Sequence, residues 1–263
     1  MDLIQIIALG FIQGLTEFLP VSSSAHLVLI SIFMSWKDQG LLMDVAAHAG
    51  SLVAVLFYFR RELIEMARAL FNPKAAQNED TIRLIIAIVI ATIPIVVAGL
   101  IFADFIEQYL RSAHVIAITT LVFALLLAYA DKAGRQLHDE YKLCWKAILF
   151  IGCAQVFALI PGTSRSGVTM TAGLMIGLTK VAAARFSFLL SIPTILAAIV
   201  YKSTQLVTTQ IHMELGPALG VFAISGVVAY FCIEAFIRLV NIVGMMPFVI
   251  YRLILGVLLF IFI

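Results

Sequence analysis

Long apolar runs recur along the chain and restrict it to folds that lie in a membrane. They cover residues 41–59, 84–102, 115–130, 186–201, 217–237 and 248–263. A helix needs about 20 apolar residues to cross a hydrocarbon core that is about 30 Å thick. Hydrophobic residues make up 63% of the 263 residues and charged residues 12%, far from the balance of a soluble domain. We therefore expect an all-α polytopic membrane protein.

Lysine and arginine predict how the chain is threaded. Segment 60–83 carries five of them and segment 131–146 carries four, whereas segment 103–114 has one arginine against two acidic residues. Because cytoplasmic loops are rich in Lys and Arg, the first two segments are expected in the cytoplasm and the third outside. The net charge is only +2 and there is no Lys/Arg-rich tract, so nucleic acid is not an expected partner.

The stretch QGLTEFLPVSSSAHL (13–27) brings polar groups into apolar sequence. Pro20 divides residues 1–36 into two apolar pieces, each shorter than a usual span, because proline removes a backbone donor and disfavours helix in the residue before it. We expect a re-entrant helical hairpin that enters and leaves on the outer face. Non-helical backbone at that depth is acceptable only inside protein or along a watery cavity.

The second half of the chain repeats this organisation. Residues 144–178 again form two short apolar pieces broken by a proline, and a shift of 141 residues lays LPVSSS (19–24) over IPGTSR (160–165). Basic residues on both sides of this second hairpin predict that it enters from the cytoplasm. The expected fold is a single membrane domain (1–263) of two inverted repeats, about 1–131 and about 144–263. Each repeat is a re-entrant hairpin plus three transmembrane helices.

The first hairpin holds candidates for acid, base and nucleophile. Gln13 and Glu17 are four residues apart and share a helix face. Ser23 and His26 are three apart, a spacing that can bring an imidazole to a serine hydroxyl and activate it. His26 could itself accept a phosphoryl group. The alternatives are an interfacial glutamate and serines that merely cap a helix.

The second hairpin holds a candidate anion site in PGTSRSG (161–167). Arg165 lies among hydroxyl residues at an expected helix start, where free N–H groups and a guanidinium suit phosphate oxygens. The alternative is an arginine that pairs with a buried carboxylate.

If the two hairpin tips meet, they surround a phosphate-sized space with complementary groups. The expected catalytic residues are Glu17, Ser23, His26 and Arg165. The expected phosphate-binding residues are Ser22, Ser24, Gly162, Thr163, Ser164, Ser166 and Thr169. A divalent cation, Mg²⁺ or Ca²⁺, on the side-chain oxygens of Gln13 and Glu17 would complete the charge balance. Asp44 and His48 are expected to form a structural contact near a helix end, with the lining of an entrance as the alternative.

These two motifs resemble those of the undecaprenyl-diphosphate phosphatase family, also called the bacitracin-resistance protein family. QGLTEFLPVSS with His26 matches its first motif, and PGTSRSGVT (161–169) matches its second. The resemblance covers the whole chain in length and in order of segments. Gln13 stands where many members of the family have glutamate, which weakens a two-carboxylate metal site.

The resemblance implies a bacterial inner-membrane enzyme whose active site opens to the periplasm. Such an enzyme removes the terminal phosphate of undecaprenyl pyrophosphate, recycles the lipid carrier for peptidoglycan synthesis and confers bacitracin resistance. It also implies Mg²⁺ or Ca²⁺, roles for Glu17, Ser23, His26 and Arg165, and a fold with two re-entrant hairpins. A homodimer is considered as well, although the sequence does not fix the oligomeric state.

A secondary transporter or flippase for an anionic or lipid-phosphate substrate is the alternative function. Inverted repeats, broken helices and an anion site at the midplane are equally typical of such carriers.

Overall fold

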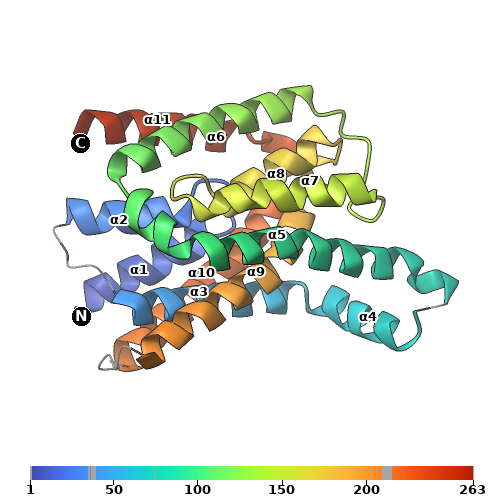
Figure 1. The fold of residues 1–263 in the computed structure, drawn as a ribbon, viewed down its shortest axis with the longest axis horizontal. Coiled ribbons are helices and arrows are strands. Elements are labelled where there is room, and N and C mark those ends of the chain that lie inside the picture. The colour runs from blue at the N-terminus through green and yellow to red at the C-terminus, as the bar shows by residue number, and fades with distance from the viewer. Residues whose placement is uncertain (1, 35, 37–39, 74, 209–214, 263) are drawn as a thin grey trace.

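The computed structural model describes residues 2–34, 36, 40–73, 75–208 and 215–262, and it is helical almost throughout (Figure 1). Residues 1 and 263, the ends of the expected domain, lie outside the described residues. The helices are α1 (Leu3–Thr16), α2 (Ser23–Phe33), α3 (Gly40–Tyr58), α4 (Arg60–Phe71), η1 (Ala76–Asn78), α5 (Glu79–Tyr109), α6 (Ala113–Ala133), α7 (Trp145–Val156), η2 (Phe157–Leu159), α8 (Arg165–Met175), α9 (Lys180–Thr208), α10 (Leu215–Val243) and α11 (Met246–Phe262). No strand occurs among these residues.

Five helices are long and apolar enough to cross a membrane, namely α3, α5, α6, α9 and α10. The shorter apolar helix α11 follows them and packs against α6. The prediction of an all-α polytopic membrane protein is therefore confirmed. Several helices are longer than the apolar segments from which they were predicted. Helix α5, for example, has 31 residues and includes part of the segment expected to be an outer loop.

Segment 60–83 differs from its prediction as a connection between spans, because it folds in part into α4. This helix is amphipathic: Met66 and Ala69 are buried, whereas Arg60, Arg61 and Arg68 are exposed. A helix of this type can lie along a membrane surface with its apolar face inward. The number of charged residues correctly predicted a polar segment, but it could not show whether that segment is a surface helix or a loop.

Two pairs of short helices form the expected hairpins. Helices α1 and α2 have 14 and 11 residues, and α7 and α8 have 12 and 11. At 1.5 Å per residue, each is at most about 21 Å long, too short to cross the hydrocarbon core alone. In Figure 1 the first hairpin enters from the left edge of the molecule and the second from the right edge. We call the turns between the paired helices the first tip (residues 17–22) and the second tip (residues 160–164).

Both tips have the same backbone conformation just before the second helix of the hairpin. Ser22 has φ 74° and Ser164 has φ 71°, each immediately before a helix. The carbonyl of Ser22 then accepts from the amide of His26, as that of Ser164 does from Val168. Equivalent positions are therefore 142 residues apart, and the 141-residue shift read from the sequence is off by one. That shift aligned the two prolines, but the helix starts set the geometry. The inverted relation of the halves stays a prediction.

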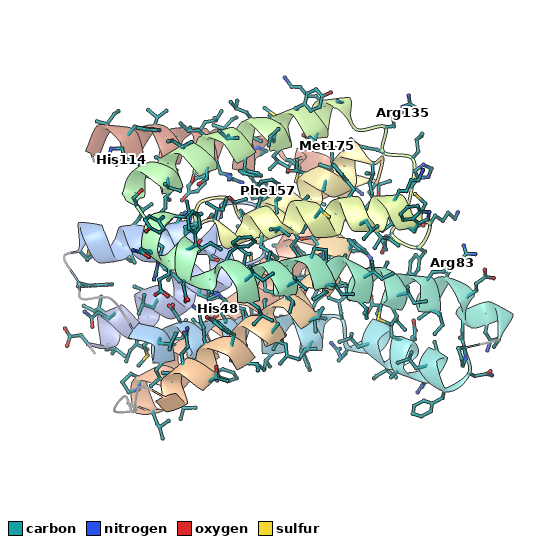
Figure 2. The ribbon with its side chains drawn as sticks, in the orientation of Figure 1. His48, Arg83, His114, Arg135, Phe157 and Met175 are labelled. Atoms are coloured by element: carbon teal, nitrogen blue, oxygen red, sulfur yellow. The ribbon has the colours of Figure 1, made fainter. Side chains whose placement is uncertain are left out.

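Close helix contacts hold each hairpin within the bundle. Helix α1 packs against α10, and α7 packs against α5. Gly152 of α7 permits the second contact, because a Cβ there would lie 2.9 Å from the backbone of Ala91. Figure 2 places Arg83 and Arg135 at one end of the bundle and His114 at the other. The basic segments thus gather at one end, as the charge pattern predicts.

Candidate active site

The two tips meet through a salt bridge between Glu17 and Arg165. The Arg165 guanidinium donates from Nη2 to Glu17 Oε1 at 3.0 Å, and both side chains are mostly buried. A second link joins the same tips, because Ser166 Oγ donates to the carbonyl of Leu19 at 2.7 Å. Residues almost 150 positions apart therefore share one site. The two groups expected on either side of a phosphate lie at one site, and in this structure they are in direct contact, which is the pairing of Arg165 with a buried carboxylate that was the alternative.

Glu17 collects hydrogen bonds on its second oxygen as well. Both Ser23 Oγ and Gln13 Nε2 donate to Glu17 Oε2 at 2.9 Å. His48 Nε2 lies 3.9 Å from the same oxygen. A carboxylate with a cation and several donors around it stays ionised even when it is buried. Glu17 is therefore an anionic acceptor that lies within reach of a serine proton.

Arg165 retains donors after it has paired with Glu17. Its Nη1 donates to the carbonyl of Ser187 at 3.2 Å, and its guanidinium carbon lies 5.9 Å from the Phe18 ring centroid. A guanidinium has five N–H donors, so two hydrogen bonds leave others for a phosphate. The Thr169 hydroxyl is hydrogen-bonded to the Ser187 hydroxyl at 2.7 Å, so the residue whose carbonyl accepts from Arg165 is itself held in place.

His26 does not form the expected contact with the Ser23 hydroxyl. Its Nδ1 lies 2.7 Å from the carbonyl of Ser22, and its Nε2 is hydrogen-bonded to the hydroxyl of Tyr251. Since a carbonyl only accepts, Nδ1 carries a proton and donates it to Ser22. The prediction of a Ser23–His26 pair is wrong in this structure because Ser23, at the first turn of α2, faces Glu17 of the preceding tip.

A cavity of about 190 Å³ lies where the tips meet. Its polar lining consists of Glu17, Ser22, Ser23, Ser24, His48, Ser164, Arg165 and Thr194. Its other lining residues are apolar and belong to α5, α9 and the segment 158–159. His26 is not among the described residues that line it. The cavity thus brings a carboxylate, an arginine and several hydroxyls to one space of phosphate size.

The remaining predicted phosphate-binding residues lie behind the cavity and not on its wall. They are Gly162, Thr163, Ser166 and Thr169, all buried. Their polar groups build the second tip: Ser166 bonds Leu19, Thr169 bonds Ser187, and the Gly162 carbonyl accepts from α11. Ser22, Ser24 and Ser164 do line the space. The motif therefore divides into residues that face the cavity and residues that shape it.

A larger pocket of about 370 Å³ adjoins this cavity, and both are lined by Ile95, Leu159, Thr194 and Ala198. At its rim Lys202 donates to Asp44 at 3.0 Å and links α9 to α3. His48 Nδ1 donates to the Asp44 carbonyl at 2.7 Å. The structural contact expected of Asp44 and His48 is therefore present, and His48 lines the cavity as well.

The expected metal ligands Gln13 and Glu17 supply oxygens of the kind that suit a small divalent cation, but Gln13 turns its Nε2 toward Glu17, so its amide must rotate before Oε1 can share a cation with the carboxylate. Gln13 is fully buried, and its Oε1 has no hydrogen-bond partner among the described residues. Amide and carboxylate oxygens suit Mg²⁺ and Ca²⁺, and Mg²⁺ usually combines one or two protein oxygens with phosphate and water. No group of three or more His, Cys, Asp or Glu side chains that could hold a metal occurs in the described chain. The protein would therefore supply only part of the coordination shell.

Two residues of α11 reach the site although the sequence reading did not select them. Tyr251 bonds His26, and Arg252 donates to carbonyls of both tips. Arg252 lay within the apolar run 248–263, and an arginine inside a span is costly enough to indicate a function. That signal was available in the sequence. Tyr251 carried no such signal, because tyrosine is common near membrane interfaces.

Comparison with known proteins gives a consistent result over the whole chain. The family model described as "Bacitracin resistance protein BacA" matches residues 6–258. Undecaprenyl-diphosphatase 1 of Pseudoalteromonas translucida is 51% identical over 263 residues, which cover 100% of this chain and 99% of the relative. Undecaprenyl-diphosphatase 2 of Stutzerimonas stutzeri is 54% identical over 261 residues, or 97% and 96% of the two chains. Undecaprenyl-diphosphatase of Nitrosococcus oceani is 51% identical over 262 residues, or 99% and 98%. The chain therefore belongs to the bacitracin resistance protein BacA family.

Proposed function

We infer that this chain is an undecaprenyl-diphosphatase. It hydrolyses undecaprenyl pyrophosphate to undecaprenyl phosphate and inorganic phosphate, and so returns the lipid carrier to cell-wall synthesis and confers bacitracin resistance. One observation carries the inference: the Glu17–Arg165 contact joins two hairpin tips at a polar cavity inside an apolar helical bundle. The names of the three relatives supply the substrate.

We propose that the pyrophosphate occupies the cavity between the tips. Arg165 would bind its oxygens through the N–H groups that Glu17 and Ser187 leave free, and Ser22, Ser24 and Ser164 would add hydroxyl groups. The prenyl tail would remain among the apolar helices, and the pocket of about 370 Å³ offers a route to the cavity that is mainly apolar, with Asp44, Glu107, Arg111 and Lys202 also in its lining. This arrangement keeps the charged head in a polar space and the tail in an apolar one.

The chemistry begins at Ser23 and Glu17. The Ser23 hydroxyl donates to Glu17, so the carboxylate can take the proton as Ser23 Oγ bonds to the terminal phosphorus. The bridging P–O bond breaks, and undecaprenyl phosphate leaves with the electron pair. Water then attacks the phosphoserine, the Oγ–P bond breaks, and the proton returns to Ser23. Arg165 stabilises the charge on the phosphoryl oxygens in both steps.

His26 has a positioning role in this scheme. Its ring connects the first turn of α2 to Tyr251 of α11, and its nitrogens are both engaged. We therefore propose Ser23, and not His26, as the phosphate acceptor.

We propose that Gln13 Oε1 and Glu17 hold Mg²⁺ or Ca²⁺. A bound divalent cation would neutralise charge on the pyrophosphate and orient it. Gln13 is neutral, so it adds an oxygen ligand without adding charge.

We further propose that the protein lies in the bacterial inner membrane with the cavity open to the periplasm. The Lys/Arg-rich segments at the opposite end support this orientation, because positive residues favour the cytoplasmic side. Glu17, Ser23 and Arg165 belong to a single chain, so the site needs no partner, and a homodimer would hold two independent sites.

Phosphate release tests the proposal. Purified protein in detergent is incubated with undecaprenyl pyrophosphate, with Mg²⁺ or with EDTA, and inorganic phosphate is measured. Release in Mg²⁺ that is lost in Glu17→Ala and Arg165→Ala variants with wild-type melting temperatures supports the scheme. No release by folded wild-type protein would overturn it. The transporter alternative is not favoured, because the relatives carry the name of a phosphatase.

A further inference from the structure

Arg252 is a fully buried cation in the middle of the apolar helix α11. No acidic side chain pairs with it among the described residues. Its hydrogen bonds go to backbone carbonyls: Nη2 donates to Gly162 at 2.9 Å and to Thr163 at 3.0 Å, and Nη1 donates to Pro20 at 3.4 Å. One side chain therefore binds the backbone of both tips.

We infer that Arg252 is a positioning residue, whose buried guanidinium holds the second tip so that its free amides face the phosphate cavity. This inference rests on the proposed function for its substrate, but the contacts that support it do not.

Peptide geometry explains the orientation. The chain has no cis peptide bonds, and in a trans peptide the C=O and the following N–H point in opposite directions. The Thr163 carbonyl and the Ser164 amide belong to the same peptide. When the carbonyl points toward Arg252, the amide therefore points away from it. Ser164 lines the cavity, and its amide has no acceptor among the described residues. Arg165 also lines the cavity, and its amide, at the start of α8, likewise has no acceptor among the residues that the structure describes.

Backbone strain at the second tip also requires such a clamp. Ser164 has φ 71°, a value that strains a non-glycine residue and persists only where the surroundings fix it. Arg252 holds the carbonyl immediately before this residue, and the Ser164 hydroxyl accepts from the Gly167 amide at 3.1 Å. Together these contacts fix the strained turn from both sides.

Neighbouring atoms closely surround the Arg252 guanidinium. A Cβ on Gly167 would lie 2.8 Å from Arg252 Nη1. The glycine of the second motif thus leaves room for the arginine of α11, which the motif itself does not contain. Gly167→Ala should therefore displace the guanidinium without removing any polar group.

The test compares Arg252→Met, Arg252→Lys and Gly167→Ala with wild type. Phosphate release from undecaprenyl pyrophosphate gives kcat and KM per folded enzyme, and hydrogen exchange of peptides across residues 160–168 reports the tip directly. We expect Arg252→Met to lower kcat about 10²-fold, because misplaced groups cost about that much, with KM changed far less. Arg252→Lys should recover about tenfold, and Gly167→Ala should lose about tenfold. Tip exchange should be faster in all three variants.

Lys180→Met is the matched control. Lys180 pairs with Asp131 at 3.2 Å, a partly buried ion pair that does not touch the tips. Its loss should lower the melting temperature and leave kcat per folded enzyme unchanged. A merely structural Arg252 would behave in the same way, with normal kcat and no rescue by lysine, and that result would overturn the inference.

Two outcomes separate this inference from the proposed function. If wild type releases no phosphate, the proposed function fails, and exchange across 160–168 still decides whether Arg252 holds the tip. If Arg252→Met does not fold, Gly167→Ala decides: wild-type kcat together with wild-type exchange in that variant would overturn the positioning role.

Discussion

The two hairpins share a backbone turn but differ in burial and in chemistry. Each tip ends in a serine with φ near 70° before a short helix. In the first hairpin Ser23 and His26 are half-buried and Ser24 is exposed, whereas in the second every residue from Ser166 to Leu174 is buried. The first brings the carboxylate and the proposed nucleophile, and the second brings the guanidinium. Under the proposed function, the first hairpin would meet the substrate and the second would serve as a rigid anion-binding support.

Separating the charges of the two tips should have the largest effect. Glu17→Gln removes the negative charge and Arg165→Lys replaces the guanidinium fork with a single ammonium, so each weakens the buried pair, and we expect kcat/KM to fall about 10³-fold or more in each. The double variant should be little worse than either single one, because the two residues act as a unit. Arg83→Lys changes an exposed i,i+4 pair with Glu79 and should leave phosphate release unchanged. Additive losses in the double variant would show that the tips act separately.

Removing one hydroxyl from each hairpin tests whether the two hairpins have different roles. Ser23→Ala deletes the proposed nucleophile and should reduce kcat about 10²- to 10³-fold. Ser166→Ala deletes the bond to the Leu19 carbonyl and a contact with the Ser164 hydroxyl, so it should cost about 1 kcal/mol of stability and much less activity. Trapping of labelled phosphate on wild type but not on Ser23→Ala checks the assignment. Labelled phosphate that persists in Ser23→Ala but disappears in His26→Ala would assign the acceptor to His26.

The two buried glutamines, Gln13 and Gln155, occupy equivalent positions 142 residues apart. Gln13 Oε1 has no partner within the described part of the chain, whereas Gln155 Oε1 accepts from Thr194 at 3.4 Å and its Nε2 donates to the Ala91 carbonyl. We expect EDTA to abolish phosphate release and Gln13→Leu to raise the Mg²⁺ needed for half-maximal rate about tenfold. Gln155→Leu should leave that Mg²⁺ concentration unchanged. Equal shifts in both variants would remove the reason to place the cation at Gln13.

The smallest effect concerns the two strained serines. Ser164 caps the Gly167 amide, so Ser164→Gly loses a cap worth about 1 kcal/mol while it relieves strain of similar size, and its melting temperature should change little. Ser22 has a hydroxyl contact with Ser24 but no such cap, so Ser22→Gly should raise the melting temperature slightly. Thermal unfolding in detergent measures both. A lower melting temperature for Ser22→Gly would mean that its positive φ is not a source of strain.

Hydrophobic patterning and proline positions were sufficient to predict most of the fold. The apolar runs, the breaks at Pro20 and Pro161 and the gathering of basic residues at one end all have local causes that a sequence displays. Helix α4 was missed as a helix because charge counts alone do not report amphipathic spacing. The meeting of Glu17 and Arg165 was predictable from chemistry, since a buried acid and a buried arginine each need a partner.

Contacts that depend on tertiary packing could not be predicted in the same way. Spacing within a helix suggested Ser23 with His26, yet Ser23 turned to Glu17 across the tip and His26 turned to Tyr251, 225 residues away. No local rule ranks a neighbour in the same helix against one from another helix. Arg252 was detectable as a charge in a span, but its three carbonyl partners were not.

The size of the cavity has a consequence for how this protein meets its substrate. A space of about 190 Å³ has room for a diphosphate head but not for a long prenyl tail, so under the proposed function the tail lies outside it, among the apolar helices and in the lipid around them. Encounters then happen by lateral diffusion in two dimensions. The saturation constant is properly a mole fraction of substrate in the bilayer or micelle, and added detergent should dilute the substrate and slow the reaction even when the bulk concentrations of protein and substrate are held constant.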